Sequence, residues 1–577
     1  MKQKRYLTVL LAVMVAIAML PVAAFASDPV PTGDWVDYAA ETFAGGSGTQ
    51  EDPYLIETEE QLAKLSKDVA EGTSYGDCFF RLESDLDLSA HRWNPIGVSI
   101  WYLDDRFTQS SFGGSFDGGN HVITGLYVDE RESKNVAGLF GNINVYTAKS
   151  NLLTIENLVI EDAVVYSSEE GLELSNSGIL AGAVTANPGQ QAVVQNITVS
   201  GQVINTATNG NNKSGGVVGE ATRATFVDCH GDGVSVSGAS NSGGFVGQSN
   251  SSVFERCTVT GTVEGLWALG GFVGYTTCTG MEPLPGEEHS FQFCSADVDV
   301  TGNDWQLGGF VGYGEYGSFE TCVAYGDVTS TATDFEPRVG GFAGNLEGAQ
   351  ASDCFACGKV TGAHPTIAAG GFLGYDGGGS TTGCAFDNTV NPDLEGIGAV
   401  GTAGVHEIAG QSTEDISATI CQDYYGGHDY SLDWTVDQEP TCTQAGSKSH
   451  HCTRCGAMTD VTEIDPLGHS AVKVEAKAAT CTQDGNDAHW YCEVCGAYFS
   501  DEGLTQVITK DQTVVKATGH SYVDGVCTMC GEADPNYSTS PETGDLSSLG
   551  LCLALLMLSG AGALGVTVYS RKRTARK

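Results

Sequence analysis

The stretch GGFVGY occurs at Gly270–Tyr275 and again at Gly308–Tyr313, with GGFVGQ at Gly243–Gln248 and GGFLGY at Gly370–Tyr375. Glycine has no side chain to pack, so its fixed recurrence must serve the backbone. We expect these glycines to lie at corners where the chain turns into or out of a strand, at φ values closed to other residues.

Related stretches recur every 27 to 41 residues. Aligned on their last glycine, they are Gly141, Gly182, Gly219, Gly247, Gly274, Gly312, Gly344 and Gly374. The Val- and Thr-rich segments between them predict two or three short strands per repeat, and no helical period appears. Short strands that cannot bury their own apolar face must stack along one axis. The repeats therefore predict an all-β fold, a right-handed parallel β-helix; a β-propeller is the alternative, but its blades need four strands.

Two side-chain positions recur with the glycines. An internal aromatic stack, continued by Leu139 and Val217, is predicted for Phe245, Phe272, Phe310, Phe342 and Phe372. One polar or thiol residue per repeat is predicted to fill a single interior turn: Asn157, Asn196, Cys229, Cys257, Cys294, Cys322, Cys354 and Cys384. Stacked rungs lie about 5 Å apart, which would allow disulfides, but small buried thiols are the simpler interpretation.

The residues ahead of the repeats predict a cap. Thr58 and Gln61 have capping-box spacing, and Leu62, Leu65 and Val69 share one face of a short helix. Such a helix can cover the open end of a β-helix, whose exposed edge would otherwise pair with other chains.

The repeat resembles the GLUG family (named for Gly-Leu-any-Gly), which is found on surface proteins of Gram-positive bacteria. The resemblance extends over about residues 45–395. It includes the opening stretches GSGTQEDPYLIETEEQLAKL (Gly46–Leu65), RLESDLDLSAHRWNPIG (Arg81–Gly97) and FGGSFDGGNHVITGLYV (Phe112–Val128). It implies a β-helix on a cell-surface protein.

The N-terminus has the pattern of an export signal. Three basic residues precede the apolar run Tyr6–Val22, and Ala24-Phe25-Ala26 follows it. A short apolar run that ends at a small-x-small site is typical of a signal peptide. We expect cleavage between Ala26 and Ser27.

The C-terminus combines SPETGD (Ser540–Asp545), an apolar run long enough to cross a bilayer, and a basic tail expected to stay cytoplasmic. Together they resemble the Leu-Pro-x-Thr-Gly sorting signal of Gram-positive wall-anchored proteins, with Ser540 in place of Leu. The resemblance implies transient membrane insertion, after which a sortase joins Thr543 to peptidoglycan and releases Gly544 with the tail. The alternative is a single-span protein that is never cleaved.

From Gly427 the pattern changes to a repeated GH…C…CxxCG. The residues are His428, Cys442, Cys452 and Cys455; His469, Cys481, Cys492 and Cys495; and His520, Cys527 and Cys530. Three cysteines with one histidine are an ordinary structural zinc set, and modules of this size have too little core to fold unaided.

Two ways of grouping these ligands remain open. The histidine could belong to its own unit or to the preceding one, which would give Cys442, Cys452, Cys455 and His469, then Cys481, Cys492, Cys495 and His520, with the last CxxC incomplete. About two zinc ions are expected, while Cys78 and Cys421 stand alone. Disulfides and redox dithiols are the competing interpretations, although no βαβ pattern supports a redox motif.

Charge and motifs limit the function. A net charge of −45 repels nucleic acid and anionic membranes. No nucleophile triad, phosphate loop or HExxH motif appears, so we expect no catalysis, although polysaccharide lyases and hydrolases also use β-helices. Tyr275, Tyr313 and Tyr375 follow the glycine block and would form a sugar-stacking strip if they face solvent; otherwise they are corner residues packing on their neighbours.

The predicted function is that of a wall-anchored adhesin or interaction protein that binds a glycan or protein on a host or bacterial surface, with a passive spacer as a further alternative. The predicted parts are a signal peptide (1–26), an N-terminal cap with the first β-helix turns (27–127), GLUG-like repeats (128–395), a C-terminal cap or linker (396–426), Cys/His-rich, zinc-ribbon-like modules (427–533), a tether (534–539) and a transmembrane sorting signal (540–577).

Overall fold

The computed structural model describes residues 31–538 except 102–106, 132–135, 146–150, 169–174, 208–211, 279–288, 304, 334–336 and 363–367. The predicted cleavage site at Ala26 and Ser27 and the sorting signal with Thr543 and Gly544 lie outside these residues. In the part of the chain that is described, no helix combines the length and apolar character needed to span a bilayer. The chain divides into two compact units, Met1–Ser431 with His451–Ala457, and Leu432–His450 with Met458–Lys577.

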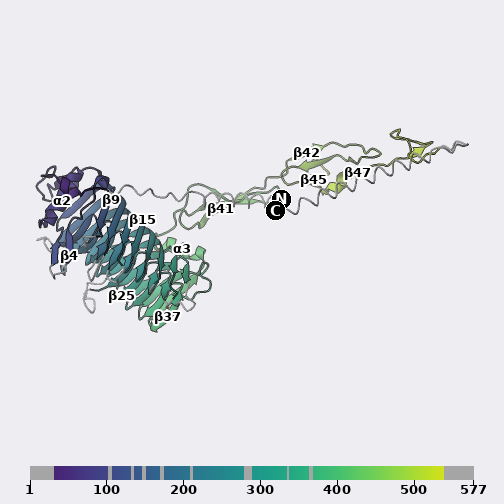
Figure 1. The fold of residues 1–577 in the computed structure, drawn as a ribbon. Helices are drawn as coiled ribbons and strands as arrows, with labels where there is room; N and C mark the ends of the chain where they lie inside the picture. Colours follow the sequence, from purple (N-terminus) through teal and green to yellow (C-terminus); the bar gives the residue numbers. More distant parts are fainter. Residues whose placement is uncertain are drawn as a thin grey trace, which may run out of the picture. The chain divides into compact units, whose positions relative to one another are not determined.

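The first unit is mostly β, with long parallel sheets of stacked strands, as in a β-solenoid (Figure 1). One sheet consists, in spatial order, of β8 (Phe140–Asn144), β11 (Ala181–Thr185), β14 (Val218–Thr222), β17 (Val246–Asn250), β21 (Val273–Thr277), β25 (Val311–Glu315), β30 (Ala343–Glu347), β35 (Leu373–Gly377) and β37 (Ile397–Thr402). A second consists of β10 (Asn176–Ser177), β13 (Lys213–Gly215), β16 (Ser242–Gly243), β20 (Leu269–Gly270), β24 (Gln306–Gly308), β29 (Arg338–Gly340) and β34 (Ala368–Gly370). Eight strands of the first sheet contain the eight aligned glycines, so the predicted stacking of the repeats is confirmed.

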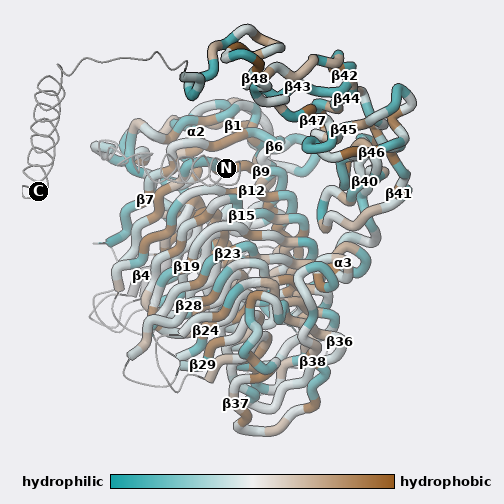
Figure 2. Tube along the Cα trace, turned by 90° about the vertical axis from the view of Figure 1, so that its right-hand side faces the viewer, coloured by the Kyte–Doolittle hydropathy of each residue, from teal (hydrophilic) through white to brown (hydrophobic). Residues whose placement is uncertain are grey.

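The third sheet has 20 strands. Its N-terminal part contains β1 (Tyr54–Ile56), β2 (Phe79–Leu82), β3 (Leu86–Asp87), β6 (Ser115–Thr124), β7 (Tyr127–Glu130), β9 (Leu152–Ser167), β12 (Gln191–Asn205), β15 (Ala224–Gly238), β18 (Val253–Glu255) and β19 (Thr258–Gly265). It continues with β22 (Ser290–Gln292), β23 (Ser295–Gly302), β26 (Ser318–Glu320), β27 (Val323–Ala324), β28 (Val328–Ser330), β31 (Gln350–Ser352), β32 (Phe355–Ala356), β33 (Val360–Gly362), β36 (Ser380–Asp387) and β38 (Val405–Gln411). Apolar and polar residues alternate along the stacked coils (Figure 2), because successive side chains of a strand point to opposite faces.

The repeated glycines lie where the chain bends between the second sheet and the first. The expectation of special φ values is wrong there, because Gly270, Gly271 and Gly274 do not have positive φ. Glycine is needed here because there is no space for a side chain. A Cβ on Gly271 would lie 2.0 Å from the carbonyl oxygen of Gly309 on the next coil, and one on Gly270 would lie 2.0 Å from the carbonyl oxygen of Val273. At this corner the backbones approach too closely for any side chain.

The predicted internal phenylalanine stack is confirmed. Phe245, Phe272, Phe310, Phe342 and Phe372 are fully buried, with successive ring centroids 4.7 to 5.1 Å apart, near the spacing of neighbouring strands. A second stack, which the sequence analysis did not single out, consists of Phe226, Phe254, Phe291 and Phe319. Rings of one stack meet rings of the other edge to face at 5.7 to 6.0 Å, an arrangement that aromatic pairs prefer.

The thiol ladder is confirmed for the cysteines and wrong for the two asparagines. The six ladder cysteines, Cys229, Cys257, Cys294, Cys322, Cys354 and Cys384, are buried free thiols. Cys229 pairs in register with Ile197, not with Asn196. Asn157 and Asn196 lie one residue earlier, at φ of 56° and 52°, a left-handed conformation that Asn tolerates better than most residues. Their side chains form an outer ladder in which the Asn196 amide donates to Asn157 at 2.8 Å.

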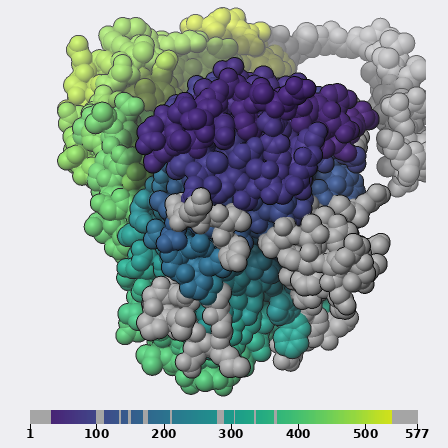
Figure 3. Space-filling view, turned by 90° about the vertical axis from the view of Figure 1, so that its left-hand side faces the viewer, coloured from purple at the N-terminus to yellow at the C-terminus, as the bar shows by residue number. Residues whose placement is uncertain are grey.

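The predicted capping helix is α2 (Glu59–Ala70), at the N-terminal end of the solenoid (Figure 1). The Thr58 hydroxyl accepts the Gln61 amide hydrogen bond, and Leu62, Leu65 and Val69 are fully buried. The first described residues, coloured purple, form one compact block over the first coils (Figure 3). This region also contains the short helices η1 (Trp35–Tyr38) and η2 (Leu88–Ala90) and the hairpin of β4 (Val98–Trp101) and β5 (Phe107–Ser110).

The last coil is followed by helix α3 (Thr413–Asp423), which belongs to the first unit. The chain then forms small antiparallel sheets. These are β39 (Thr435–Gln438), β40 (Gly446–His451) and β41 (Met458–Ile464); β42 (Ala471–Val474), β44 (His489–Cys492), β45 (Tyr498–Phe499) and β46 (Val507–Ile508); β43 (Gly485–Asn486) with β47 (Val514–Val515); and β48 (Tyr522–Val523) with β49 (Val526–Cys527). A single 3-10 turn, η4 (Lys510–Thr513), precedes β47.

Candidate metal centres

The predicted metal ligands gather into three clusters of three cysteines and one histidine. In each cluster the four ligand atoms lie within 4.8 Å of one another. The clusters are Cys421, His428, Cys452 and Cys455; Cys442, His469, Cys492 and Cys495; and Cys481, His520, Cys527 and Cys530. The first belongs to the first unit, and the other two belong to the second unit.

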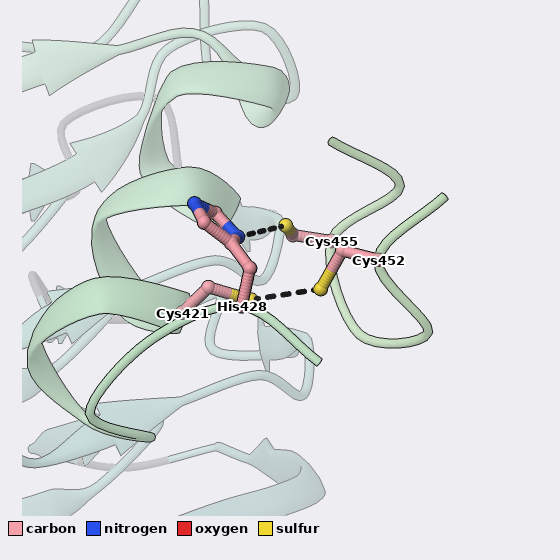
Figure 4. A group of neighbouring side chains, drawn as sticks. All are labelled: Cys421, His428, Cys452 and Cys455. Atoms are coloured by element: carbon pink, nitrogen blue, oxygen red, sulfur yellow. Dashed lines mark hydrogen bonds between the residues drawn. The ribbon is translucent and has the colours of Figure 1, made fainter. Parts of the chain in front are cut away.

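In each cluster, one sulfur–sulfur and one sulfur–nitrogen distance are close to the edges of a tetrahedron around zinc. Ligand bonds of about 2.3 Å to sulfur and about 2.0 Å to nitrogen give edges of about 3.8 Å between sulfurs and about 3.5 Å between sulfur and nitrogen. The Sγ–Sγ distances are 3.8 Å for Cys421–Cys452, 3.9 Å for Cys442–Cys492 and 3.7 Å for Cys481–Cys527. The Sγ–Nδ1 distances are 3.2 Å for Cys455–His428 (Figure 4), 3.4 Å for Cys495–His469 and 3.4 Å for Cys530–His520.

The donor set therefore fits a closed structural zinc site. The described cysteines are free thiols, and their separations across each cluster are far longer than a disulfide bond of about 2.0 Å. With four protein ligands already in tetrahedral reach, no position is left for a substrate or a reactive water. Zinc bound here would hold the chain together rather than perform chemistry.

Each CxxC motif folds into the same tight turn. In the second cluster the Gly496 amide donates to the Cys492 carbonyl at 2.8 Å, and the Cys492 amide donates to the Ala497 carbonyl at 2.9 Å; both bonds recur in the other clusters. Gly456, Gly496 and Gly531 have φ of 72°, 76° and 76°. Glycine adopts this left-handed conformation without a steric cost, so the glycine after each motif is required by the backbone.

The turn also favours the metal-binding form of its first cysteine. The Cys495 amide and then the His469 side chain lower the pKa of the Cys492 thiol to about 6. The Cys530 and Met529 amides lower the pKa of Cys527 to about 5. The metal ligand is a thiolate, not a thiol. A lowered pKa therefore favours the form of these cysteines that binds a metal cation.

The structure corrects how the ligands are grouped. Each histidine joins the CxxC of its own unit, but Cys442 and Cys481 join the CxxC of the following unit instead of their own. The last CxxC is therefore complete, because Cys481 supplies its fourth candidate ligand, and the described residues contain three candidate sites where about two were expected. Cys421 does not stand alone, since it completes the first site.

Cys442 and Cys481, which join the CxxC of the following unit, are positioned by a local motif. Each cysteine is the second residue of a Thr-Cys-Thr-Gln turn. In the first turn the Thr441 amide donates to the Gln444 carbonyl, and in the second the Thr480 amide donates to the Gln483 carbonyl, both at 2.9 Å. The Leu467 amide then donates to the Thr441 carbonyl at 2.9 Å. This bond ties the turn to the segment that precedes the next histidine. The repeated TCTQ tetrapeptide was the available sequence signal for this pairing.

The remaining histidines near the ligands have other partners. His450 lies 4.0 Å from the Trp434 ring, between ring centroids, and 3.2 Å from the Asp433 carbonyl. His489 is 6% exposed and lies 2.8 Å from the Asp487 carbonyl. Neither belongs to a cluster of candidate metal ligands.

The predicted tyrosine strip occupies one register position on neighbouring strands. The rings of Tyr275 and Tyr313 stack on each other at 5.1 Å, and the Tyr275 hydroxyl donates to Glu315 at 2.5 Å. The Arg338 guanidinium lies 3.6 Å from the centroid of the Tyr375 ring. These faces are half-buried and already in contact with protein groups, which favours the packing alternative over sugar stacking.

Comparison with known proteins gives partial matches. No protein-family model matches this chain. A protein of Evansella cellulosilytica, provisionally named a Gly-rich membrane protein, is 32% identical over 167 residues, which are 28% of this chain and 16% of that protein. Halomucin of Haloquadratum walsbyi is 32% identical over 189 residues, 31% of this chain and 2% of halomucin. The chain thus spans less than a fifth of either curated relative, and the GLUG resemblance stays a prediction.

Solved structures also align with the chain. One of them is a protein from Bacteroides ovatus provisionally described as an immunoglobulin A1 protease, aligned over 68% of this chain and 93% of that chain, with a TM-score of 0.37 and 18% identity. We draw no conclusion on function from this alignment.

Proposed function

We propose that this chain is an extracellular surface protein anchored to a Gram-positive cell wall, in which metal-folded modules carry a β-solenoid that contacts other surfaces. The observation that carries the proposal is the order of parts along the chain. The parallel sheets end at Gln411, three Cys₃His clusters follow from Cys421 to Cys530, and the stretch that resembles a sorting signal comes after them. Similarity to a protein named as a membrane protein supports a place at the cell surface.

Each part contributes a physical property that display requires. The coil, which we take to be right-handed as parallel crossovers nearly always are, is rigid because each turn pairs with its neighbours. Structural zinc folds small modules that have little core. The net charge of −45 keeps the chain solvated and disfavours nucleic acid as a partner.

Catalysis is not part of the proposal. Asp376, His406 and Thr381 lie in line, with Asp376 2.9 Å from His406 Nε2 and Thr381 Oγ1 3.3 Å from Nδ1. Yet Thr381 and Asp376 are each 1% exposed. Burial opposes the Asp376 charge, but the Gly404 and Gly378 amides and His406 hold its pKa low. The set ties the last coil together and offers no surface nucleophile.

Thr543→Ala tests the anchor. We expect the variant to leave the wall fraction and collect in the membrane or the medium, because the sortase acyl-enzyme forms on the Thr carbonyl and the resemblance makes that side chain part of the recognised motif. Fractionation after muramidase digestion, followed by immunoblotting, measures the shift. Thr539→Ala changes a threonine outside the motif and should stay in the wall. A Thr543→Ala protein still covalently linked to peptidoglycan would refute the anchoring proposal.

Binding is tested separately on the same strains. The mature chain and the intact cells are presented to glycan arrays and host cells, and wild-type cells should adhere while Thr543→Ala cells should not. If wild-type cells and purified protein both fail to bind, the solenoid is a passive spacer. Turnover of an acidic polysaccharide would instead favour the enzyme alternative.

A further inference from the structure

Helix α3 carries a candidate metal ligand directly after the last residue of its buried apolar face. Cys421, in its last turn, is 1% exposed, and Ile416 and Ile420 are 1% and 3% exposed. Ile416 and Ile420 are four positions apart and share one face of the helix, and Cys421 directly follows Ile420, about 100° further around the helix. The helix therefore buries its apolar side chains and its thiol together.

That apolar face covers a patch on the outside of the solenoid. Val323, Phe355 and Ala385 form a separate apolar cluster with Ile416 and Ile420. The residues next to them in the strands, Ala324, Ala356 and Phe386, belong instead to the main core. Successive strand residues face opposite sides, so the patch is on the outer face of the third sheet. Without the helix, this patch would be exposed to solvent.

Packing alone holds the helix weakly. It has 11 residues, a length at which isolated helices are marginal in water. A cavity of about 280 Å³ remains beside it, lined in part by Tyr325, Ile420 and Cys421. Polar ties add to this packing: the Tyr424 hydroxyl donates to the Phe293 carbonyl at 3.0 Å, and the Thr413 amide donates to Thr389 at 3.2 Å.

The first metal cluster joins this helix to a returning segment of the chain. Cys421 comes from α3, His428 follows seven residues later, and Cys452 and Cys455 come from His451–Ala457, a segment that lies within the first unit although its flanking residues do not. Cys421 Sγ lies 3.8 Å from Cys452 Sγ (Figure 4). The Arg454 guanidinium of the same segment lies 4.5 Å from the Tyr425 ring.

We propose that zinc bound by Cys421, His428, Cys452 and Cys455 is a clasp that fastens helix α3 over the outer patch of the solenoid. On binding, each cysteine thiol loses its proton to solvent and the sulfur bonds to the metal. The ion thereby ties the helix end to the returning segment and limits how far α3 can open. This inference rests on the proposed metal binding, but it adds a specific role for one of the three sites.

Hydrogen exchange of the zinc-loaded mature chain tests the clasp. Cys421→Val removes the ligand while keeping an apolar side chain at a buried position. We expect it to lower bound zinc from three to two per chain and to speed amide exchange in residues 413–423 by at least about tenfold, since local opening then costs less. Cys442→Val removes a ligand from the second site and is the matched control: it should also lose one zinc but leave exchange in α3 unchanged.

Cys357 provides a second readout. It packs against the outer patch, and burial raises the pKa of its thiol to about 12, so it should resist alkylation while α3 is in place. Peptide-resolved alkylation should increase in Cys421→Val and not in Cys442→Val. If Cys421→Val loses one zinc while α3 stays as protected as in the wild type, the clasp is refuted and zinc binding stands. If the wild-type chain binds no metal, the clasp and the proposed structural zinc fall together.

Discussion

Removal of bound metal is expected to unfold the second unit while the solenoid stays folded. Among the described residues of the second unit, the buried apolar cluster is small and consists of Cys442, Cys492 and Phe499. Other apolar side chains are exposed, among them Val494 at 67% and Val507 at 69%. So little buried surface cannot offset the entropy of ordering the chain, and two of the three buried residues are themselves proposed ligands. Metal binding would therefore supply most of the folding free energy.

The measurement combines elemental analysis with limited proteolysis. The mature chain, purified under reducing conditions, should hold about three zinc ions. After chelation, protease should cut within 458–533 and spare the solenoid core. Cys78→Ser changes a thiol outside the clusters and should alter neither result. If the second unit keeps its protection without metal and its CxxC thiols are found oxidised, disulfides hold these modules and the zinc proposal is wrong.

The parts of the fold that could be predicted are those with a local, repeated cause. The glycine blocks and the phenylalanines recur because every coil packs against equivalent neighbours. The position predicted for a residue in one repeat therefore applies to the equivalent residue in the others. The predicted position of the thiols inside the solenoid followed from the same register. The two asparagines were placed wrongly because a one-residue offset is invisible in an unaligned repeat, although it moves a side chain from the interior to the outer face.

The metal sites were harder because their ligands come from different repeats. The CxxCG turn and the preceding histidine are local, and the prediction of their chemistry agrees with the structure. The fourth ligand is not local: Cys442 meets Cys492, and Cys421 meets Cys452. Nothing in the spacing distinguishes a cysteine that serves its own unit from one that serves the next. The repeated TCTQ tetrapeptide marks the two cysteines, and the bond from the Leu467 amide to the Thr441 carbonyl links the first of these turns to the segment before the next histidine.

The reason for the repeated glycines was also mistaken, and this leads to a second large expected effect. The substitution Gly271→Ala should destabilise the solenoid severely. The added Cβ would lie 2.0 Å from the carbonyl oxygen of Gly309 and 3.3 Å from the Cβ of Ala296. The first obstacle is backbone on the next coil, which is fixed by parallel hydrogen bonds and cannot rotate away as a side chain could. We expect a loss of about 3 kcal/mol or more, at or above the upper end of ordinary overpacking.

Gly45→Ala is the matched control because it adds the same methyl group where there is room. The backbone of Gly45 does not have positive φ, and the nearest atom to an added Cβ is Leu55 Cδ1 at 3.5 Å, an ordinary contact. Denaturant unfolding of the mature chain, followed by tryptophan fluorescence, reports on the solenoid because Trp93 is 2% exposed in its core. The midpoint should fall sharply for Gly271→Ala and change little for Gly45→Ala. Equal midpoints for the two variants would mean that the coils can separate at the corner, and close backbone approach would then not explain why the chain repeats these glycines.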